Sequence, residues 1–170
     1  MMTSVSVSTS TYTRTHTAAF VSDKLRTLLK MLVRDYGLNP EKVVDSWNDW
    51  VDEAARTWLI SGHLTAVVME FYKPGSDFAA ARWDFPISYD GDEDDEDLWV
   101  DRHFFRETIS KAKAPPSNCN YRIILKAKPG KPYVPGVGST SLRSTDGLTA
   151  RRQGTVISTR DIVATAKVYQ

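Results

Sequence analysis

The sequence has few of the features that disulfide-bonded, membrane and secreted proteins need. Cys119 is the only cysteine, which excludes an intramolecular disulfide and a cysteine metal cluster and fits a reducing, cytoplasmic setting. No apolar run approaches the ~18 residues that span a bilayer, and the start lacks the apolar core of a signal peptide. The net charge is +1, so no strong overall field attracts nucleic acid or a membrane surface.

Catalytic and metal-binding motifs are also missing. The three histidines, His16, His63 and His103, are scattered without a second ligand at helical spacing. Cys119 lies in a Pro/Ser/Asn-rich stretch with no obvious base to activate it. The acidic run at residues 92–97 offers oxygen ligands but lacks calcium-loop spacing, which favours a solvated loop over a metal site. We therefore expect no catalytic residue, no metal and no cofactor.

Hydrophobic periodicity predicts three helices. The first has an apolar stripe at three- and four-residue steps, with Thr17 as its N-cap, and ends at Gly37. The second opens with Asn39 and Pro40 and closes at residues 61–62. The third contains Phe105 and ends before two consecutive prolines.

Alternating and β-branched segments predict the strands. Residues 64–72 and 78–89 flank a turn-forming stretch and indicate a hairpin, and residues 121–127 indicate a further strand. Residues 5–13 alternate Ser or Thr with Val, which favours a strand or an extended arm. Pro86 suggests a sheet edge or a bulge. The order of elements predicts an α+β fold, with helices against a mainly antiparallel sheet.

The last part of the chain, residues 128–170, is too long for an ordinary loop. It starts with a Pro/Gly-rich stretch and continues with strand-forming segments. Seven Lys and Arg residues are spread along it against two Asp, which leaves a diffuse signal for nucleic acid. A strand-forming tail behind a Pro/Gly hinge indicates a segment that moves.

Several short strings follow one another along the chain: Tyr12-Thr13-Arg14-Thr15-His16-Thr17, Ser61-Gly62-His63-Leu64, Arg82-Trp83-Asp84, Tyr121-Arg122-Ile123-Ile124-Leu125 with Lys128-Pro129-Gly130, and Leu142-Arg143-Ser144-Thr145-Asp146-Gly147. In this order they resemble bacterial HORMA-domain proteins of the kind encoded beside cGAS/DncV-like nucleotidyltransferases in anti-phage (CBASS) operons. The resemblance covers essentially the whole chain. It implies a single HORMA domain with an N-terminal arm (1–13), a core (14–127) and a mobile C-terminal safety belt (128–170).

The resemblance also implies a function. HORMA proteins close their belt over a short partner peptide, the closure motif, which adds to the core sheet as a strand. In the bacterial systems the closed protein binds and activates the nucleotidyltransferase, and an AAA+ remodelling ATPase reopens it by pulling on the N-terminus. A second HORMA protein is a further candidate partner. The implied function is therefore a non-enzymatic peptide-binding switch in antiviral defence.

Specific residues follow from this assignment. The belt residues expected to pair with the core sheet or cover the peptide are Leu142, Arg143, Leu148, Val156, Ile157, Ile162 and Val163. The hinge is expected at Pro129, Gly130, Pro135, Gly136 and Gly138, and engagement of the ATPase at Val5, Val7 and Tyr12. Two alternatives stay open: an accessory protein that binds nucleic acid through the basic tail, and a constitutive scaffold without switching.

Overall fold

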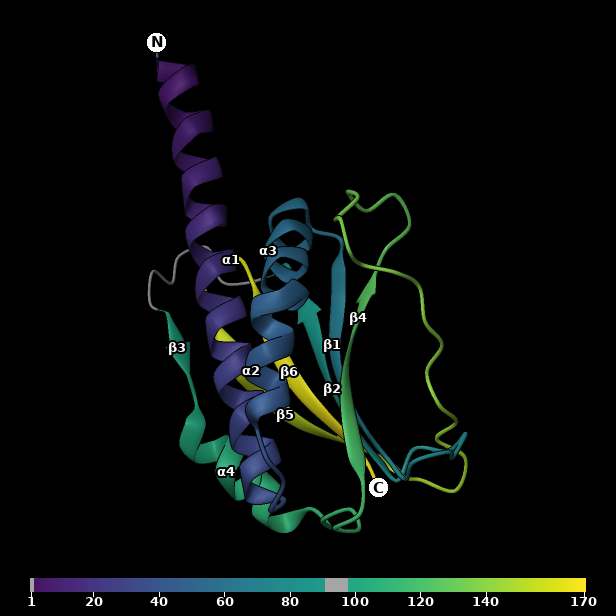
Figure 1. Cartoon of the computed structure of the whole chain (residues 1–170). Helices are drawn as coiled ribbons and strands as arrows, with labels where there is room; N and C mark the ends of the chain where they lie inside the picture. Colours follow the sequence, from purple (N-terminus) through teal and green to yellow (C-terminus); the bar gives the residue numbers. More distant parts are fainter. Residues whose placement is uncertain (1, 91–97) are drawn as a thin grey trace.

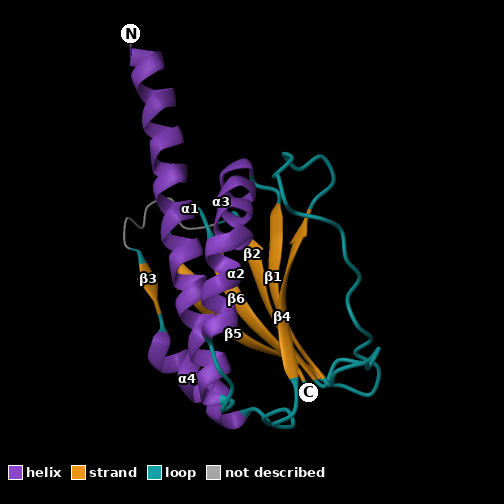
Figure 2. Ribbon diagram, in the orientation of Figure 1, coloured by secondary structure: helices purple, strands orange, loops and turns teal. Residues whose placement is uncertain are grey.

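Helices cover one face of a six-stranded antiparallel sheet (Figures 1 and 2). The computed structural model describes residues 2–90 and 98–170, with side chains from residue 14 onward. The strands are β1 (Leu64–Tyr72), β2 (Ala81–Ser88), β3 (Trp99–Val100), β4 (Asn120–Ala127), β5 (Ala150–Ser158) and β6 (Val163–Tyr169), in the order β3-β5-β6-β2-β1-β4. The expected α+β class is confirmed, and so are the predicted hairpin and the strand at residues 121–127.

The first helix, α1, spans Met2–Asp35 and is longer than the sequence predicts. Its apolar stripe is buried as expected, and Gly37 follows its end with a φ of +76°. The expectations of a strand or extended arm at residues 5–13 and of an N-cap at Thr17 are wrong. Thr17 lies inside the helix, where its hydroxyl donates to the carbonyl of Arg14 over 3.2 Å. Helix growth from a packed core adds one hydrogen bond per residue, which outweighs the weak helix propensity of Ser, Thr and Val.

The second helix is continuous but changes its winding in the middle. It consists of α2 (Glu41–Ser46), a π-helical turn η1 (Trp47–Val51) and α3 (Asp52–Ser61), and Gly62 ends it in the left-handed conformation. The Asn39 side chain accepts the Glu41 backbone N–H over 2.9 Å and satisfies one donor near the helix start. The cap residue is Pro40 and the helix begins at Glu41, one residue later than the sequence predicts. The third helix, α4 (Arg102–Lys111), begins behind Asp101, whose carboxylate accepts the Phe104 N–H.

The two faces of β1 are both buried, by different parts of the chain. Val67, Met69 and Phe71 lie in the main core beneath the helices. The alternate residues Ala66 and Val68 form a smaller apolar cluster with Ile124 on the opposite face. A strand buried on both faces needs cover on the side away from the helices, and the C-terminal part of the chain supplies it.

Pro86 lies in a central strand, so the expectation of a sheet edge is wrong. It pairs with Ala66 of β1 within a continuous ladder. On its other side, β2 pairs with β6 at residues 82–84 and again at residues 87–88, without pairs at Phe85 and Pro86 between them. The register is the same on both sides of this gap, so it is an interruption and not a bulge. The missing proline N–H is accommodated at this interruption.

Residues 128–170 divide into two parts. Residues 128–149, called here the crossover segment, leave the end of β4 and run outside this strand in an irregular path to the start of β5 (Figure 1). Strands β5 and β6 then form the C-terminal hairpin, which lies beside β2 at the opposite side of the sheet from β4. The Arg14 side chain of α1 bonds Asp161 in the turn of this hairpin.

Candidate functional site

A cavity of about 560 Å³ lies between β4 and the crossover segment. Within the described sheet β4 pairs only with β1, so its other edge faces the cavity. Trp50 and Trp58 of the second helix form a further part of the wall. The remaining lining consists of Ile123, Ile124, Leu125, Ala127, Lys131, Pro132, Tyr133, Val134, Gly136, Val137, Gly138, Ser139 and Thr140. Size and lining fall in the range of ligand pockets.

Backbone geometry shows which residues of β4 present hydrogen-bonding groups to the cavity. The Tyr121 N–H donates to the Asn120 side-chain oxygen over 2.9 Å, and its carbonyl accepts from the Lys42 ammonium over 2.6 Å. Both groups therefore point away from β1. Backbone direction alternates along a strand, so Ile123 and Leu125 direct their N–H and C=O to the same edge. This edge can pair with an added strand.

Side chains of the second helix hold the start of the crossover segment. The Trp58 indole N–H donates to the carbonyl of Pro132 over 2.8 Å. The Lys131 ammonium lies 5.7 Å from the centre of the Trp58 ring, a cation–π distance. Tyr133 is 84% exposed at the rim of the cavity, although aromatic side chains favour burial. The wall opposite β4 is thus fixed at one end and carries an unburied aromatic ring.

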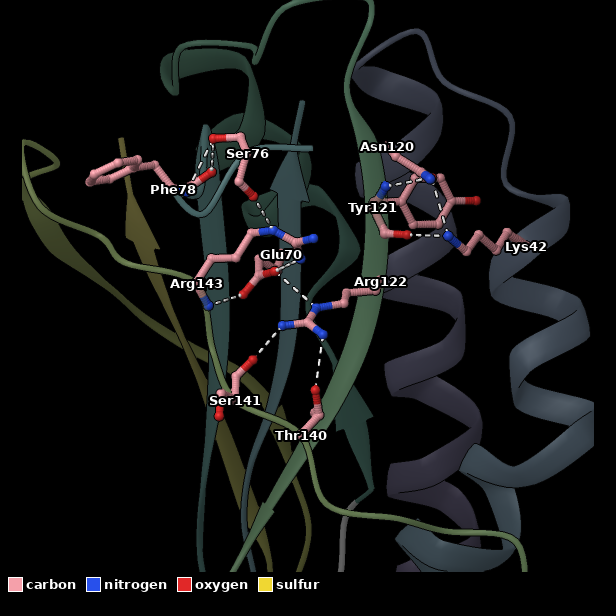
Figure 3. A network of polar contacts seen from close by, with 10 residues as sticks. All are labelled: Lys42, Glu70, Ser76, Phe78, Asn120, Tyr121, Arg122, Thr140, Ser141 and Arg143. Carbon is pink, nitrogen blue, oxygen red and sulfur yellow. Dashed lines mark hydrogen bonds and ion pairs between the residues drawn. The ribbon is translucent and has the colours of Figure 1, made fainter. Parts of the chain in front are cut away.

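A buried carboxylate fastens the far end of the crossover segment to the sheet (Figure 3). Glu70 of β1 is fully buried and accepts the Arg143 backbone N–H over 2.9 Å and the Arg143 guanidinium over 2.6 Å. It also accepts from Arg122 of β4 over 2.9 Å. Arg122 in turn donates to the Thr140 hydroxyl over 3.1 Å and to the Ser141 carbonyl. We call Glu70, Arg122 and Arg143 the latch.

The latch keeps Glu70 ionised. Burial alone raises the pKa of this carboxyl, but the hydrogen bonds from Arg143 and Arg122 and the Arg122 charge outweigh it and lower the pKa below its usual value. The Arg143 guanidinium also lies 3.5 Å from the centre of the Tyr72 ring and donates to the Ser76 carbonyl over 2.8 Å. One residue of the crossover segment, Arg143, therefore contacts both the carboxylate and the β1–β2 turn.

The predicted belt residues lie in three places. Leu142 packs on the small cluster of Ala66, Val68 and Ile124, next to the latch residue Arg143. Leu148 is half-buried near the end of the crossover segment. The others belong to the C-terminal hairpin or its turn: Val156, Ile157 and Ile162 are fully buried, and Val163 pairs with Ser88 of β2.

The predicted hinge residues lie along the crossover segment. Gly130 and Gly136 each follow a proline and have φ angles of +83°, which fits Pro-Gly turns. Gly136 and Gly138 also line the cavity. Val5 and Val7 lie in the first turns of α1 and Tyr12 further along it, and their side chains are outside the described part of the chain.

The basic residues of the tail are dispersed and several have partners. Arg143 belongs to the latch, and Lys128, Lys131 and Lys167 lie over the aromatic rings of Tyr89, Trp58 and Tyr169. Arg152 and Lys167 are cross-strand neighbours in the C-terminal hairpin, whereas Lys128, Lys131 and Arg143 belong to the crossover segment.

The described residues offer little for catalysis. Among them no group of three or more His, Cys, Asp or Glu side chains is arranged to hold a metal ion. Burial raises the pKa of the Cys119 thiol, with a smaller opposing effect from Lys73, which disfavours a reactive thiolate. The acidic run at residues 92–97 lies outside the described part of the chain. Within the described part of the chain, no helix is both long enough and apolar enough to cross a membrane.

Comparison with known protein families decides the classification. The sequence model of the family "Bacterial HORMA domain 2" matches residues 2–170. The chain belongs to the bacterial HORMA-domain family. No curated protein sequence matches it.

Solved structures with the same fold include HORMA proteins bound to partners. A chain of a mitotic checkpoint complex is 12% identical, with a TM-score of 0.57 over 90% of this chain and 95% of that one. The HORMA protein of a CdnC complex from E. coli MS115-1 is 16% identical, with a TM-score of 0.52 over 94% and 88%. HTP-2 of C. elegans, solved with the HIM-3 closure motif, is 13% identical, with a TM-score of 0.51 over 69% and 66%. At these identities the likeness establishes the fold.

Sequence reasoning missed most residues around the cavity of this HORMA domain. The position of Trp58 indicates a buried helix face, and the side chain is indeed buried in the core, but nothing local indicates that it also lines the cavity. Lys42 and Arg122 carry no local signal because their partners are remote along the chain. Glu70 did carry a signal. A carboxylate inside a strand whose residues are apolar on both faces must be paired, since an isolated buried charge is costly.

Proposed function

We propose that this HORMA domain captures an extended peptide at the outer edge of β4 and encloses it beneath the crossover segment. The observation that carries the proposal is the cavity between that edge and residues 131–140. An added strand gains main-chain hydrogen bonds from Ile123 and Leu125, and the apolar lining accepts its alternate side chains. The family match and the fold shared with closure-motif complexes support the same assignment.

The enclosure depends on two attachments of the crossover segment. One end continues directly from β4, and the other is fastened by the latch and by the C-terminal hairpin in the sheet. A peptide under the segment is therefore surrounded by covalently continuous chain, and it is released only when the latch and hairpin open. The present arrangement corresponds to the closed form of such a switch.

We further propose that the peptide-bound form acts as a non-enzymatic cytoplasmic regulator in antiviral defence. In this scheme it binds and activates a cGAS/DncV-like nucleotidyltransferase, and an AAA+ ATPase reopens it from the N-terminus. The fold shared with the HORMA protein of the E. coli CdnC complex supports the first partner. The long α1, whose N-terminal turns project beyond the rest of the molecule in Figure 1, offers a place for the second.

The peptide-binding step can be tested with one proline. Leu125→Pro removes an N–H at the outer edge of β4 and keeps the ladder with β1, because proline is tolerated where the N–H faces away from the sheet. The full chain is co-expressed with a library of random peptides on a carrier protein, and bound peptides are sequenced. Wild type should enrich a sequence motif, and Leu125→Pro should lose at least about 90% of that enrichment.

A matched control separates the lost edge from lost folding. Leu125→Val keeps the N–H and should bind like wild type, and circular dichroism should show that Leu125→Pro remains folded. Equal peptide recovery by the folded proline variant and wild type would contradict binding at this edge.

The activation step needs a separate assay. Purified CdnC-type enzyme is assayed with peptide-bound wild type and with the peptide-free proline variant, and nucleotide product should rise only with peptide-bound wild type. Equal product with the peptide-free proline variant would refute activation by the closed complex.

A further inference from the structure

The edge of β4 that faces the cavity ends at a positively charged group. Lys42 of α2 reaches over Tyr121 and donates to its carbonyl over 2.6 Å and to the Asn120 side-chain oxygen over 3.1 Å (Figure 3). The same Asn120 oxygen accepts the Tyr121 N–H. Both backbone groups of Tyr121 on this edge are thus occupied by side chains. An added strand can pair with Leu125 and Ile123 but not with Tyr121.

The Lys42 ammonium has no anionic partner among the described residues. Its two hydrogen-bond acceptors are neutral oxygens, and an ammonium has three donors. Partial burial lowers the pKa of Lys42, although the side chain is exposed. The acids Glu41 and Asp45 lie on the same helix and are also exposed, and no ion pair joins either of them to Lys42 among the described residues. One donor of the exposed Lys42 ammonium therefore remains for a ligand.

The cavity next to this end of β4 provides no competing acid among its described lining residues. Its described lining contains one charged side chain, Lys131, and no carboxylate. Lys131 lies in the part of the crossover segment that follows the Ala127 end of β4, whereas Lys42 lies at the Asn120 end. The cavity lining is therefore mainly apolar with Lys131 at one end, and Lys42 adds a positive charge beyond the lining at the other end, where strand pairing stops. A peptide with apolar side chains followed by a negative charge complements that second end.

Resting on the proposed peptide capture, we propose that Lys42 and Asn120 form a carboxylate-binding stop that sets the register and sequence preference of the peptide. Every strand pair of this sheet is antiparallel. A peptide added in the same sense runs antiparallel to β4, and its C-terminal part then approaches Tyr121. At about 3.3 Å per residue, a carboxylate two residues beyond the position opposite Ile123 reaches Lys42. It is either an Asp or Glu side chain or the terminal carboxylate of the peptide.

The test compares three peptide libraries, each with two randomised apolar positions, presented on a carrier protein and co-expressed with the full chain. In the first, Glu stands two residues after the second apolar position and a Gly/Ser tail follows. In the second, Gln replaces Glu. In the third, the peptide ends at Gln, which supplies only a terminal carboxylate. Wild type should enrich the first or third library about ten-fold over the second, in line with a charge-assisted hydrogen bond.

Two variants assign the preference to Lys42. Lys42→Gln keeps a donor for the Tyr121 carbonyl and should reduce the preference to within two-fold, whereas Lys126→Gln, a matched loss of charge on β4, should retain it. Equal recovery of all three libraries by wild type, or a preference that survives in Lys42→Gln, overturns the carboxylate stop and leaves peptide capture standing. Failure of wild type to recover any library overturns both. Whether the first or the third library is enriched identifies the source of the carboxylate.

Discussion

Replacing Glu70 with glutamine should release the crossover segment while the helices and the main core stay folded. Gln keeps the shape of the side chain but removes the charge that faces the guanidinium groups of Arg122 and Arg143. The Glu70 side chain is fully buried, and those of the two arginines are 26% and 22% exposed. The variant thus leaves two partly buried cations without their shared anion.

The size of the effect follows from the bonds that attach the crossover segment. Arg143 provides two of the three hydrogen bonds to Glu70, one from its backbone and one from its guanidinium. Hydrogen bonds to charged groups contribute about 1.5–3 kcal/mol each, and the exposed part of the arginines reduces this by screening. We expect the opening of the segment to become easier by about 2–2.8 kcal/mol, or roughly 30- to 100-fold in its equilibrium constant.

Hydrogen exchange measures this opening directly, because the Arg143 amide donates to Glu70 in the closed form. In Glu70→Gln the exchange of this amide should accelerate by the same roughly 30- to 100-fold, while buried α1 amides near Leu28 keep wild-type rates. Glu53→Gln, an exposed change of the same chemistry, should leave both unchanged. An Arg143 amide in Glu70→Gln that exchanges within three-fold of wild type would refute the assignment of the latch.

Three further predictions follow from contacts described above. Because the pKa of Glu70 is lowered in the folded state, the latch contributes stability above about pH 4, and this stability is lost as the pH falls through the folded-state pKa. Amide NMR shifts of the crossover segment should show this acid transition in wild type. The same transition in Glu70→Gln would argue against the assignment to Glu70. Trp58→Phe removes the 2.8 Å bond to the Pro132 carbonyl and should weaken that attachment by about 1 kcal/mol, seen as faster exchange at residues 131–134, and unchanged exchange would count against it. Gly154→Ala places a Cβ 3.3 Å from Phe104 at a φ of +113° and should lower the Tm by about 3–6 °C, so an unchanged Tm would contradict the strain.

The core elements were predictable because their patterns are local. The stripe that contains Val21 and Leu25 and the alternation of Val67 and Met69 each identify a buried face within a few residues of sequence. The N-terminal turns of α1 were not predictable in this way. Their Ser, Thr and Val residues favour a strand by composition, but the packed helix that follows extends through them.

The candidate site was less predictable because its parts meet only in the folded chain. Trp58 lies far from Leu125 and Pro132 in the sequence, and all three line one cavity. Which edge of β4 faces that cavity depends on the strand order, and the hydrogen bonds of Tyr121 show it. The sequence does indicate a long C-terminal segment with turns at its Pro-Gly pairs, because such turns depend on local residue chemistry.

The interruption at Pro86 makes the pairing of β2 with β6 weaker than its pairing with β1. On one side β2 is joined to β1 by six consecutive residue pairs, and on the other its pairs with β6 fall into two short groups on either side of the gap. Two short ladders can separate one after the other, each with a smaller barrier than an unbroken ladder of the same length. Under load we expect the sheet to part first between β2 and β6 and to stay intact between β2 and β1. The C-terminal hairpin is then expected to detach as a unit, while the hairpin of β1 and β2 remains folded beneath the helices.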